Sequence, residues 1–266
     1  MDDDNLSARA ITECLKTRFI GQHVRYYPSL TSTMGVARRA ARQGAAEGTV
    51  ILSDEQTAGK GRLKRAWLTP RGNIALSVIL HPALTSLPSL IMLTSLAVVR
   101  SIESVTGLKP QIKWPNDILI KEKKVSGILI ENEVLGSQVT TIIGIGIDVN
   151  LRLADYPEIQ SIATSLSGEL GREVSHLKVI RCLLVEMENL YLDLSAGGSP
   201  SASLRTGLYE EWRDNLVTLG KQVRAASEDT VYEGVAESVD RDGSLLLRRP
   251  DGSLTRIVAG DVTLRG

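Results

Sequence analysis

Residues 113–130 read KWPNDILIKEKKVSGILI, and this stretch decides the fold class. Its apolar runs are short, rich in isoleucine, and interrupted by Pro115 and by a turn of charged residues, which is the pattern of neighbouring short strands rather than of a helix. A further apolar run follows Gly136. We therefore expect one mixed or antiparallel sheet, with strands at 111–114, 118–120, 125–130 and 139–147.

Upstream of this stretch we expect both helices and strands. Residues 32–43 are rich in Ala and Arg and end before Gly44, which is typical of a helix with Ser32 or Thr33 as its N-cap. Residues 90–105 carry apolar side chains at helical spacing and predict a helix in the core. The other elements expected here are a helix at 7–19 and strands at 23–27, 49–53 and 74–80.

Downstream, helical spacing predicts helices at 177–194 and 203–216. From Gly220 onward the pattern changes to short strands, and the dipeptides Asp242-Gly243 and Asp251-Gly252 are typical of hairpin turns. A small C-terminal β-barrel explains this pattern. We thus expect an α+β fold, a mixed sheet flanked by helices followed by the barrel, with a leader at 1–24, a main domain at 25–218 and the small domain at 219–266.

Composition excludes several classes of function. The 266 residues carry no net formal charge, so no global field favours nucleic acid or an anionic membrane. Cys14 and Cys182 lie far apart and show neither disulfide nor zinc spacing. The acidic start lacks the features of a signal peptide, and we find no apolar run near the ~18 residues of a membrane span. We expect a cytoplasmic enzyme.

Residues 56–67, QTAGKGRLKRAW, have the composition of an anion-binding loop. Four cations fall between Lys60 and Arg65, interleaved with Gly59 and Gly61. Glycine lets backbone amides approach an anion, and arginine offers a forked set of donors to phosphate or carboxylate. Neither the Walker A pattern nor G-x-G-x-x-G is present. A solvated basic loop is the alternative interpretation.

Residues 59–67 resemble the glycine-arginine loop of biotin protein ligases, G-R-G-R-x-x-R-x-W, at every fixed position except Lys60. Further segments resemble the same family in the same order, from about Thr17 to the C-terminus. They are Ser32-Thr33-Met34, KWPND at 113–117, KVSGIL at 124–129 and GIGIDVN at 144–150. The resemblance implies the class II synthetase-like catalytic fold with an SH3-like C-terminal domain.

The resemblance also implies an activity, ATP-dependent biotin protein ligation. Such an enzyme forms biotinyl-5'-AMP from biotin and ATP with Mg²⁺, and then transfers biotin to a lysine of a biotin carboxyl carrier protein. Bringing a carboxylate to a phosphate demands local positive charge. The carrier lysine is the nucleophile, which agrees with the absence of a Ser-His-Asp or Cys-His pattern around His23, His81 and His176.

Site residues follow from the resemblance, position by position. Arg62 and Lys124 are the expected catalytic residues, with Lys60 toward biotin and Arg65 toward the ATP phosphates. The biotin-binding set is Ser32, Thr33, Met34, Gln56, Gly59, Lys60, Gly61, Arg62, Lys124 and Gly127. The ATP-binding set is Arg62, Arg65, Trp67, Asn116, Lys124 and Asp148, with Asp148 also the expected metal ligand.

Several of these residues have simpler interpretations. Lys124 resembles an exposed turn lysine when taken alone, and Ser32 and Thr33 resemble a helix cap. By resemblance Trp67 lies near adenine and Trp114 packs beneath the biotin pocket. We rank Asn116 above its neighbour Asp117, which has a purely structural alternative.

Four positions depart from the family pattern. Lys64 stands where relatives often have glycine, which adds charge and removes backbone freedom. Met34 replaces an asparagine and removes a polar contact near biotin, and Lys60 keeps the charge of arginine without its fork. Asp148 stands where many relatives carry asparagine, so its carboxylate would either bind Mg²⁺ or repel phosphate.

Two other functions stay open, a lipoate or octanoate protein ligase and a biotin-sensing regulator without ligase activity. Residues 15–21 resemble the linker that follows the DNA-binding domain of some family members, so we expect the monofunctional type, without that domain and without specific nucleic-acid binding. No membrane partner is expected, and a homodimer is possible.

Overall fold

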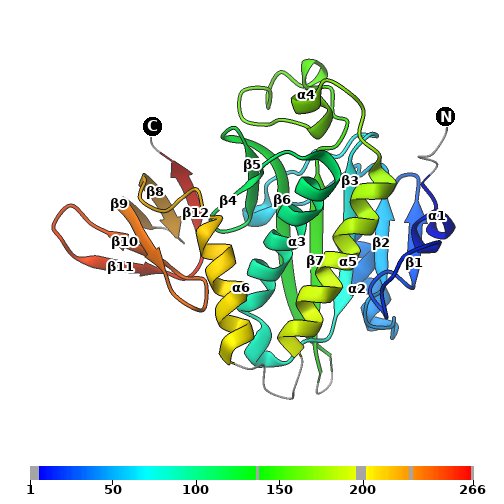
Figure 1. The fold of residues 1–266 in the computed structure, drawn as a ribbon, viewed down its shortest axis with the longest axis horizontal. Helices are drawn as coiled ribbons and strands as arrows, with labels where there is room; N and C mark the ends of the chain where they lie inside the picture. The colour runs from blue at the N-terminus through cyan, green and yellow to red at the C-terminus, as the bar shows by residue number, and fades with distance from the viewer. Residues whose placement is uncertain (1–5, 136–137, 196–201, 228–229, 265–266) are drawn as a thin grey trace.

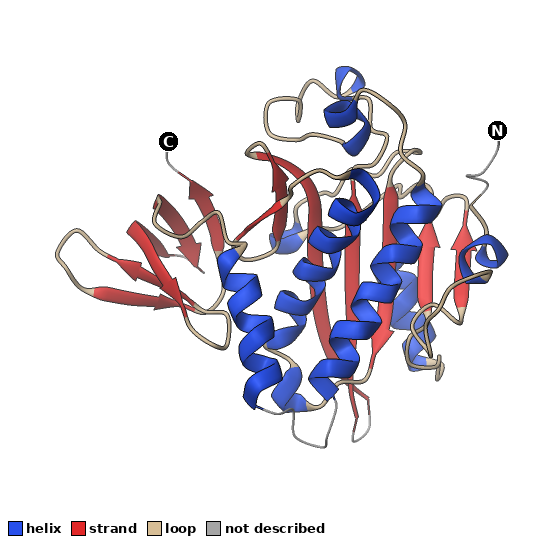
Figure 2. Ribbon diagram, viewed as in Figure 1, coloured by secondary structure: helices blue, strands red, loops and turns tan. Residues whose placement is uncertain are grey.

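The computed structural model describes residues 6–135, 138–195, 202–227 and 230–264. A seven-stranded sheet forms the main body, and a separate five-stranded sheet lies at the C-terminal end of the chain (Figure 1). Helices α3 and α5 lie across one face of the larger sheet, as Figure 2 shows. The predicted α+β class with a mixed sheet is confirmed.

The large sheet has the strand order β1-β2-β3-β7-β6-β5-β4. It is mixed because β1 runs parallel to β2, whereas all the other neighbours are antiparallel. The expected strands are all present near their predicted bounds, except that the strand predicted at 125–130 is longer in the structure and spans 123–135. They are β1 (Val24–Tyr27), β2 (Val50–Ser53), β3 (Ile74–Leu80), β4 (Gln111–Lys113), β5 (Asp117–Ile120), β6 (Lys123–Leu135) and β7 (Gln138–Ile147).

Apolar side chains point to both faces of this sheet, which explains why its strands read as nearly continuous apolar runs. On β3, Leu76 and Val78 join the main core under α3 and α5, while Ile79 joins a smaller cluster under α2. The helices are α1 (Ala8–Thr12), α2 (Thr33–Arg42), α3 (Ser89–Thr106), α4 (Leu166–Leu170), α5 (His176–Ser195) and α6 (Ala202–Asp214). Single turns of 3-10 helix occur at Arg62–Lys64, Leu84–Ser86 and Leu153–Asp155.

Helix α3 is the central helix of the core and ends at Gly107, which adopts the left-handed conformation that glycine favours. Its 18 residues, with a mean hydropathy of 1.3, are long and apolar enough to cross a membrane, so our expectation that no segment approaches that length is wrong. Most of the helix is buried, however, and Arg100 bonds Glu186 and Glu211 on neighbouring helices. These contacts identify a core helix.

The helix predicted at 7–19 is wrong beyond its first turns, because α1 ends at Thr12 and Cys14 adopts a left-handed backbone with φ of 71°. The backbone N–H groups of Arg18, Phe19 and Ile20 donate instead to the carboxylate of Glu188 on α5. Donors that bind a buried carboxylate are unavailable to a helix. The competing partner lies some 170 residues away and leaves no local sequence signal.

The C-terminal sheet is antiparallel, in the order β11-β10-β9-β8-β12. The two predicted turn dipeptides connect β9 to β10 and β10 to β11, with φ of 86° at Gly243 and 82° at Gly252. A pairing of β11 with β12, which would close a barrel, does not occur among the strand pairs of the described residues. The strands are β8 (Gln222–Ser227), β9 (Thr230–Val239), β10 (Leu245–Arg248), β11 (Leu254–Ile257) and β12 (Asp261–Leu264).

We predict that Glu188→Ala destabilises the fold, because the side chain is only 4% exposed and accepts three backbone N–H groups. Losing these charge-assisted bonds should lower the free energy of unfolding by about 3–5 kcal/mol, measured by urea denaturation. The exposed Glu158→Ala serves as the control and should change it by less than about 0.5 kcal/mol. Equal effects of the two variants would contradict the anchoring role.

Candidate functional site

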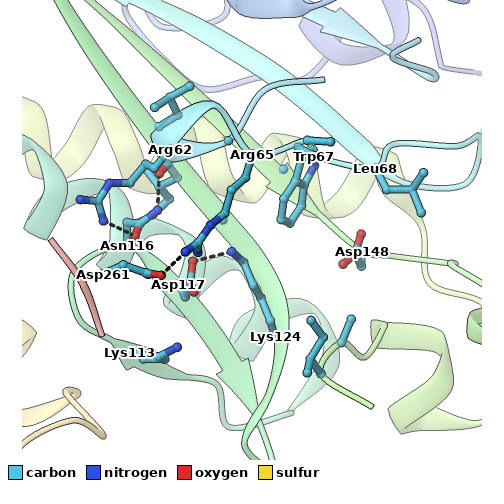
Figure 3. A pocket seen from close by; sticks show the side chains of 18 of the residues that line it. Arg62, Arg65, Trp67, Leu68, Lys113, Asn116, Asp117, Lys124, Asp148 and Asp261 are labelled. Atoms are coloured by element: carbon cyan, nitrogen blue, oxygen red, sulfur yellow. Dashed lines mark hydrogen bonds and ion pairs between the residues drawn. The ribbon is translucent and has the colours of Figure 1, made fainter. Parts of the chain in front are cut away.

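A cavity of about 750 Å³ opens above the ends of β5, β6 and β7, a size typical of small-molecule sites. Its lining comes mainly from the basic loop around residues 60–68, the strands of the sheet, the loop at 159–163 and strand β12 of the C-terminal sheet, with Thr33, Met34 and Gln56 on a further side. Figure 3 shows the charged side chains that these segments bring together. The cavity therefore lies at the junction of the two sheets.

A β-bulge turns Lys124 into this cavity. Ser126 pairs with Ile118 and Lys124 with Leu119, so Val125 is an extra residue on β6. Without an extra residue, Lys124 and Gly127 would face opposite sides of the sheet. With it they share one side, and a Cβ built on Gly127 would lie 3.2 Å from Nζ of Lys124.

The Lys124 ammonium has two neighbours. Its Nζ lies 2.5 Å from Oδ1 of Asp117 and 5.1 Å from the centre of the Trp67 ring, within the range of a cation–π contact. Asp117 stands at the start of β5, directly across the sheet from Gly127. The lysine is therefore held as a fixed charge inside the cavity.

Trp67 lies flat against a pair of glycines. Gly127 on β6 and Gly146 on β7 are register partners, and Cβ atoms built on them would lie 3.1 Å and 2.2 Å from the Trp67 ring. The second distance is shorter than any real contact, so the ring occupies space that a side chain at Gly146 would fill. Glycine is required here by close approach rather than by a turn.

Arg62 connects the basic loop both to the main domain and to the C-terminal domain. Its guanidinium donates to Oδ1 of Asn116, at 2.9 Å, and to the backbone carbonyl of Gly260, at 2.9 Å. The Asn116 side chain in turn donates to the carbonyl of Ile128. Burial lowers the pKa of Arg62 from its usual value, opposed by the nearby carboxylates of Asp261 and Asp117. Both direct acceptors are neutral, so no carboxylate pairs with this charge by direct hydrogen bonding.

Arg65 reaches the C-terminal sheet as well. Its Nη2 lies 2.6 Å from Oδ2 of Asp261, the first residue of β12. Figure 3 shows Arg62, Arg65 and Lys124 close together, with Asn116, Asp117 and Asp261 as their partners. The arrangement gives the cavity three cationic groups from two segments far apart in sequence.

A chain of hydrogen bonds marks a polar part of the cavity. The Ser77 hydroxyl donates to Oγ1 of Thr33, which donates to Oε1 of Gln56, and the Gln56 amide donates to Oγ1 of Thr69. The backbone N–H of Thr33 also donates to Gln56, at 2.8 Å. Met34 follows on the same helix and packs against Gly144. This part offers fixed polar groups beside an apolar surface, which suits a neutral polar ring.

Asp148 follows β7 and lines the same cavity, with only 4% of the residue exposed. Burial raises the pKa of Asp148 to about 8, although the charge of Lys124 opposes the rise. The carboxyl group is therefore neutral at pH 7. In this form it adds no repulsion toward an anionic ligand.

The comparisons with known proteins agree with this geometry. A model of the biotin/lipoate A/B protein ligase family matches residues 26–150, and one of the biotin protein ligase C-terminal domain matches residues 218–265. The chain is 38% identical to "Bifunctional ligase/repressor BirA" of Bacillus subtilis, over 97% of this chain and 79% of the relative. The chain belongs to the biotin protein ligase family.

Two further matches support this membership. A "Biotin--[acetyl-CoA-carboxylase] ligase" of Paracoccus denitrificans is 32% identical, over 76% of this chain and 85% of that protein. Among solved structures, "Biotin protein ligase from Aquifex aeolicus in complex with biotin and ATP" superposes with a TM-score of 0.77 at 27% identity, covering 92% of this chain and 99% of that one. The family is one of ligase enzymes, and the fold expected from the resemblance is confirmed.

Most of the residues expected in a biotin ligase site line the one cavity. Ser32 and Gly59 do not. Ser32 occupies the predicted N-cap position of α2, but its hydroxyl is buried and makes no capping hydrogen bond. A Cβ on Gly59 would lie 2.3 Å from the Trp67 carbonyl. The expected residues that line the cavity are Thr33, Met34, Gln56, Lys60, Gly61, Arg62, Arg65, Trp67, Asn116, Lys124, Gly127 and Asp148.

Trp114 does not line the cavity. Its indole N–H donates to the carbonyl of Gly243, in the turn between β9 and β10, at 2.8 Å, and its backbone N–H donates to Oγ1 of Thr218. The side chain is 1% exposed and packs between the two sheets, so it stabilises their junction. It supports the site through this junction.

Sequence reasoning missed several lining residues. Asp117, ranked below Asn116, turns out to be the partner of Lys124. Gly144 and Gly146 had a usable signal, because glycines two apart on a strand share one face and mark a close approach. No local pattern could place a β12 residue such as Asp261 in the cavity. Further lining residues outside the expected set include Lys113, Leu129, Ile159, Ser161, Ile162, Ala163, Lys221, Val262, Thr263 and Leu264.

The donor set does not fit a resident metal centre. Within the described ranges no group of three or more His, Cys, Asp or Glu side chains lies close enough to hold an ion. Asp117 is engaged by Lys124, and the Asn116 oxygen accepts from Arg62. A neutral Asp148 would have to lose a proton before binding a cation. Any Mg²⁺ would therefore enter as part of the ATP complex, held largely by phosphates.

We predict that Gly146→Ala expels Trp67 from its position, because the new methyl group would lie 2.2 Å from Nε1. Trp114 and Trp212 are almost fully buried, so acrylamide quenching reports mainly on Trp67. Quenching should rise in this variant. Gly207→Ala, where a Cβ meets open space on α6, is the matched control and should leave quenching unchanged. No increase for Gly146→Ala would refute the stacked position.

We also predict a pH effect from Asp148. In the unfolded chain this group ionises near its ordinary pKa of 3.8, whereas the folded protein keeps the proton until about pH 8. The folded state binds more protons between these values, so this carboxyl lowers the free energy of unfolding as pH rises. Asp148→Asn should flatten that decline in urea denaturation between pH 5 and 8. Asp155→Asn, at an exposed position, should not change the decline. If the free energy of unfolding of the unaltered protein and both variants falls with pH in parallel, the raised pKa of Asp148 is contradicted.

Proposed function

We propose that this protein is an ATP-dependent biotin protein ligase, which forms biotinyl-5'-AMP and transfers biotin to a lysine of a biotin carboxyl carrier protein. The observation that carries the proposal is the convergence of Arg62, Arg65 and Lys124 on one cavity that also holds the polar chain of Thr33 and Gln56. The Aquifex aeolicus relative, described in complex with biotin and ATP, has the same fold.

The cationic groups serve the first half-reaction. The biotin carboxylate attacks the α-phosphate, one C–O–P bond forms, and pyrophosphate leaves with the electrons of the broken P–O bond. Arg62 and Lys124 would hold the two reacting anions together and stabilise the charge that builds on the transferring phosphoryl group. Asp148 in its neutral form lets this occur without a further negative charge in the cavity.

The ligand would lie across the cavity with its polar ring at Thr33 and Gln56, and with adenine near Trp67. The hydrogen-bonded Gln56 amide fixes the direction of both donors and acceptors, as recognition of a ureido ring requires. Met34 would supply an apolar contact where the family usually has asparagine, a role consistent with its packing against Gly144. Mg²⁺ would accompany the ATP phosphates.

The second half-reaction needs only that the carrier lysine can reach the bound biotinyl-5'-AMP and is held in position to attack it. The amine of the carrier lysine attacks the acyl carbon of the mixed anhydride, an amide bond forms, and AMP leaves. The partner is proposed from a relative named biotin--[acetyl-CoA-carboxylase] ligase. The absence of specific nucleic-acid binding, a cytoplasmic location and a possible homodimer remain predictions.

We predict that Arg62→Ala and Lys124→Ala each reduce pyrophosphate release from biotin and ATP-Mg²⁺ by at least about 10²-fold, the usual effect of losing one electrostatic contact to a transition state. Lys178→Ala, an exposed charge on α5, is the control and should retain the rate of the unaltered protein. The rate of pyrophosphate release is measured by converting pyrophosphate to phosphate with pyrophosphatase and following the phosphate continuously.

The alternatives give different results in the same assay. A lipoate or octanoate ligase would release pyrophosphate with those acids and not with biotin. A regulator without ligase activity would bind biotin but release none, and would label no carrier domain. Either result would contradict the proposed function.

A further inference from the structure

The C-terminal sheet supplies a carboxylate to the cationic cavity. Asp261 lines the cavity with the three residues that follow it on β12, and its Oδ2 accepts from Arg65 at 2.6 Å. The preceding carbonyl, of Gly260, accepts from Arg62. A Cβ on Gly260 would lie 2.5 Å from the carbonyl of Ala226, so the backbone is tightly seated at this point. The small domain thus binds both loop arginines, and Figure 3 shows its Asp261 beside Arg65.

The ion pair between Arg65 and Asp261 has the properties of a replaceable contact. The Arg65 side chain is 65% exposed and that of Asp261 is 26% exposed, and pairs with so much contact with water contribute little to stability. A triphosphate brings several negative charges and more acceptor oxygens than one carboxylate, so it competes well for a guanidinium. Arg62 differs, because it is bound by neutral acceptors that carry no competing charge.

Building on the function proposed above, we propose that Asp261 is a displaceable counter-ion that holds Arg65 until the β- and γ-phosphates of ATP take its place. Asp261 is then a positioning residue, which keeps the basic loop beside the cavity in the absence of nucleotide. It also weakens nucleotide binding, because ATP has to displace it. A nucleotide without the outer phosphates leaves the pair intact.

Direct binding tests this assignment without relying on catalysis. The probe is α,β-methylene-ATP with Mg²⁺, titrated by calorimetry into the full-length protein; its methylene bridge prevents it from donating its adenylyl group. Asp261→Asn should tighten binding about two- to fivefold, the range expected for releasing one exposed ion pair. Binding of AMP should not change. In an Arg65→Gln background the effect of Asp261→Asn should disappear, because the two residues act through one contact.

Glu237→Gln is the matched control. It removes a carboxylate, 41% exposed, that pairs with Arg248 on the same sheet at 2.7 Å, and neither residue lines the cavity. It should leave the affinity for the probe unchanged, which excludes a general effect of net charge.

Several outcomes would overturn the assignment: unchanged or weaker binding by Asp261→Asn, tightening that persists in the Arg65→Gln background, equal tightening of AMP, or no binding of the probe to either protein. Failure of the proposed function is distinguishable, because it appears as absent pyrophosphate release by the unaltered protein and leaves the comparison of binding constants intact.

Discussion

The close contact of Trp67 with the paired glycines 127 and 146 is the constraint on which the site depends. Because these positions lack side chains, the indole lies directly on the sheet. The loop that carries Trp67 therefore lies close to β6. Arg62 and Arg65 therefore come within reach of Lys124, whose ammonium packs over the same ring. A side chain at Gly146 would lift the ring and separate the loop from the lysine.

A second constraint is electrostatic. Several cations are gathered in a partly buried space, and the protein compensates their charges in two ways. Lys124 has a carboxylate partner in Asp117, Arg65 has one in Asp261, and Arg62 has neutral acceptors, with a pKa lowered by burial. Asp148, buried in the same space, stays protonated at neutral pH. The site thus keeps positive charge available for anionic ligands while remaining folded without them.

Sequence patterns predicted the strands and most helices, because apolar periodicity and turn dipeptides are local properties. They also placed Lys124 and Gly127 in the site through family resemblance, although nothing in the sequence revealed the bulge at Val125 that puts both on one face. The errors arose from distant contacts. Glu188 takes the N–H groups of the expected N-terminal helix, and Asp261 enters the cavity from another sheet. Such partners are defined only by the folded chain.

The most direct test of the central claim is mass spectrometry of the small molecules bound to the protein after incubation with biotin, lipoate and ATP-Mg²⁺ together, without a carrier domain. A site in which Arg62 and Lys124 bring a carboxylate to the α-phosphate, beside the polar group at Thr33 and Gln56, should yield biotinyl-5'-AMP close to one equivalent per chain. Recovery of lipoyl-AMP in its place, or of no acyl-adenylate, would contradict the account.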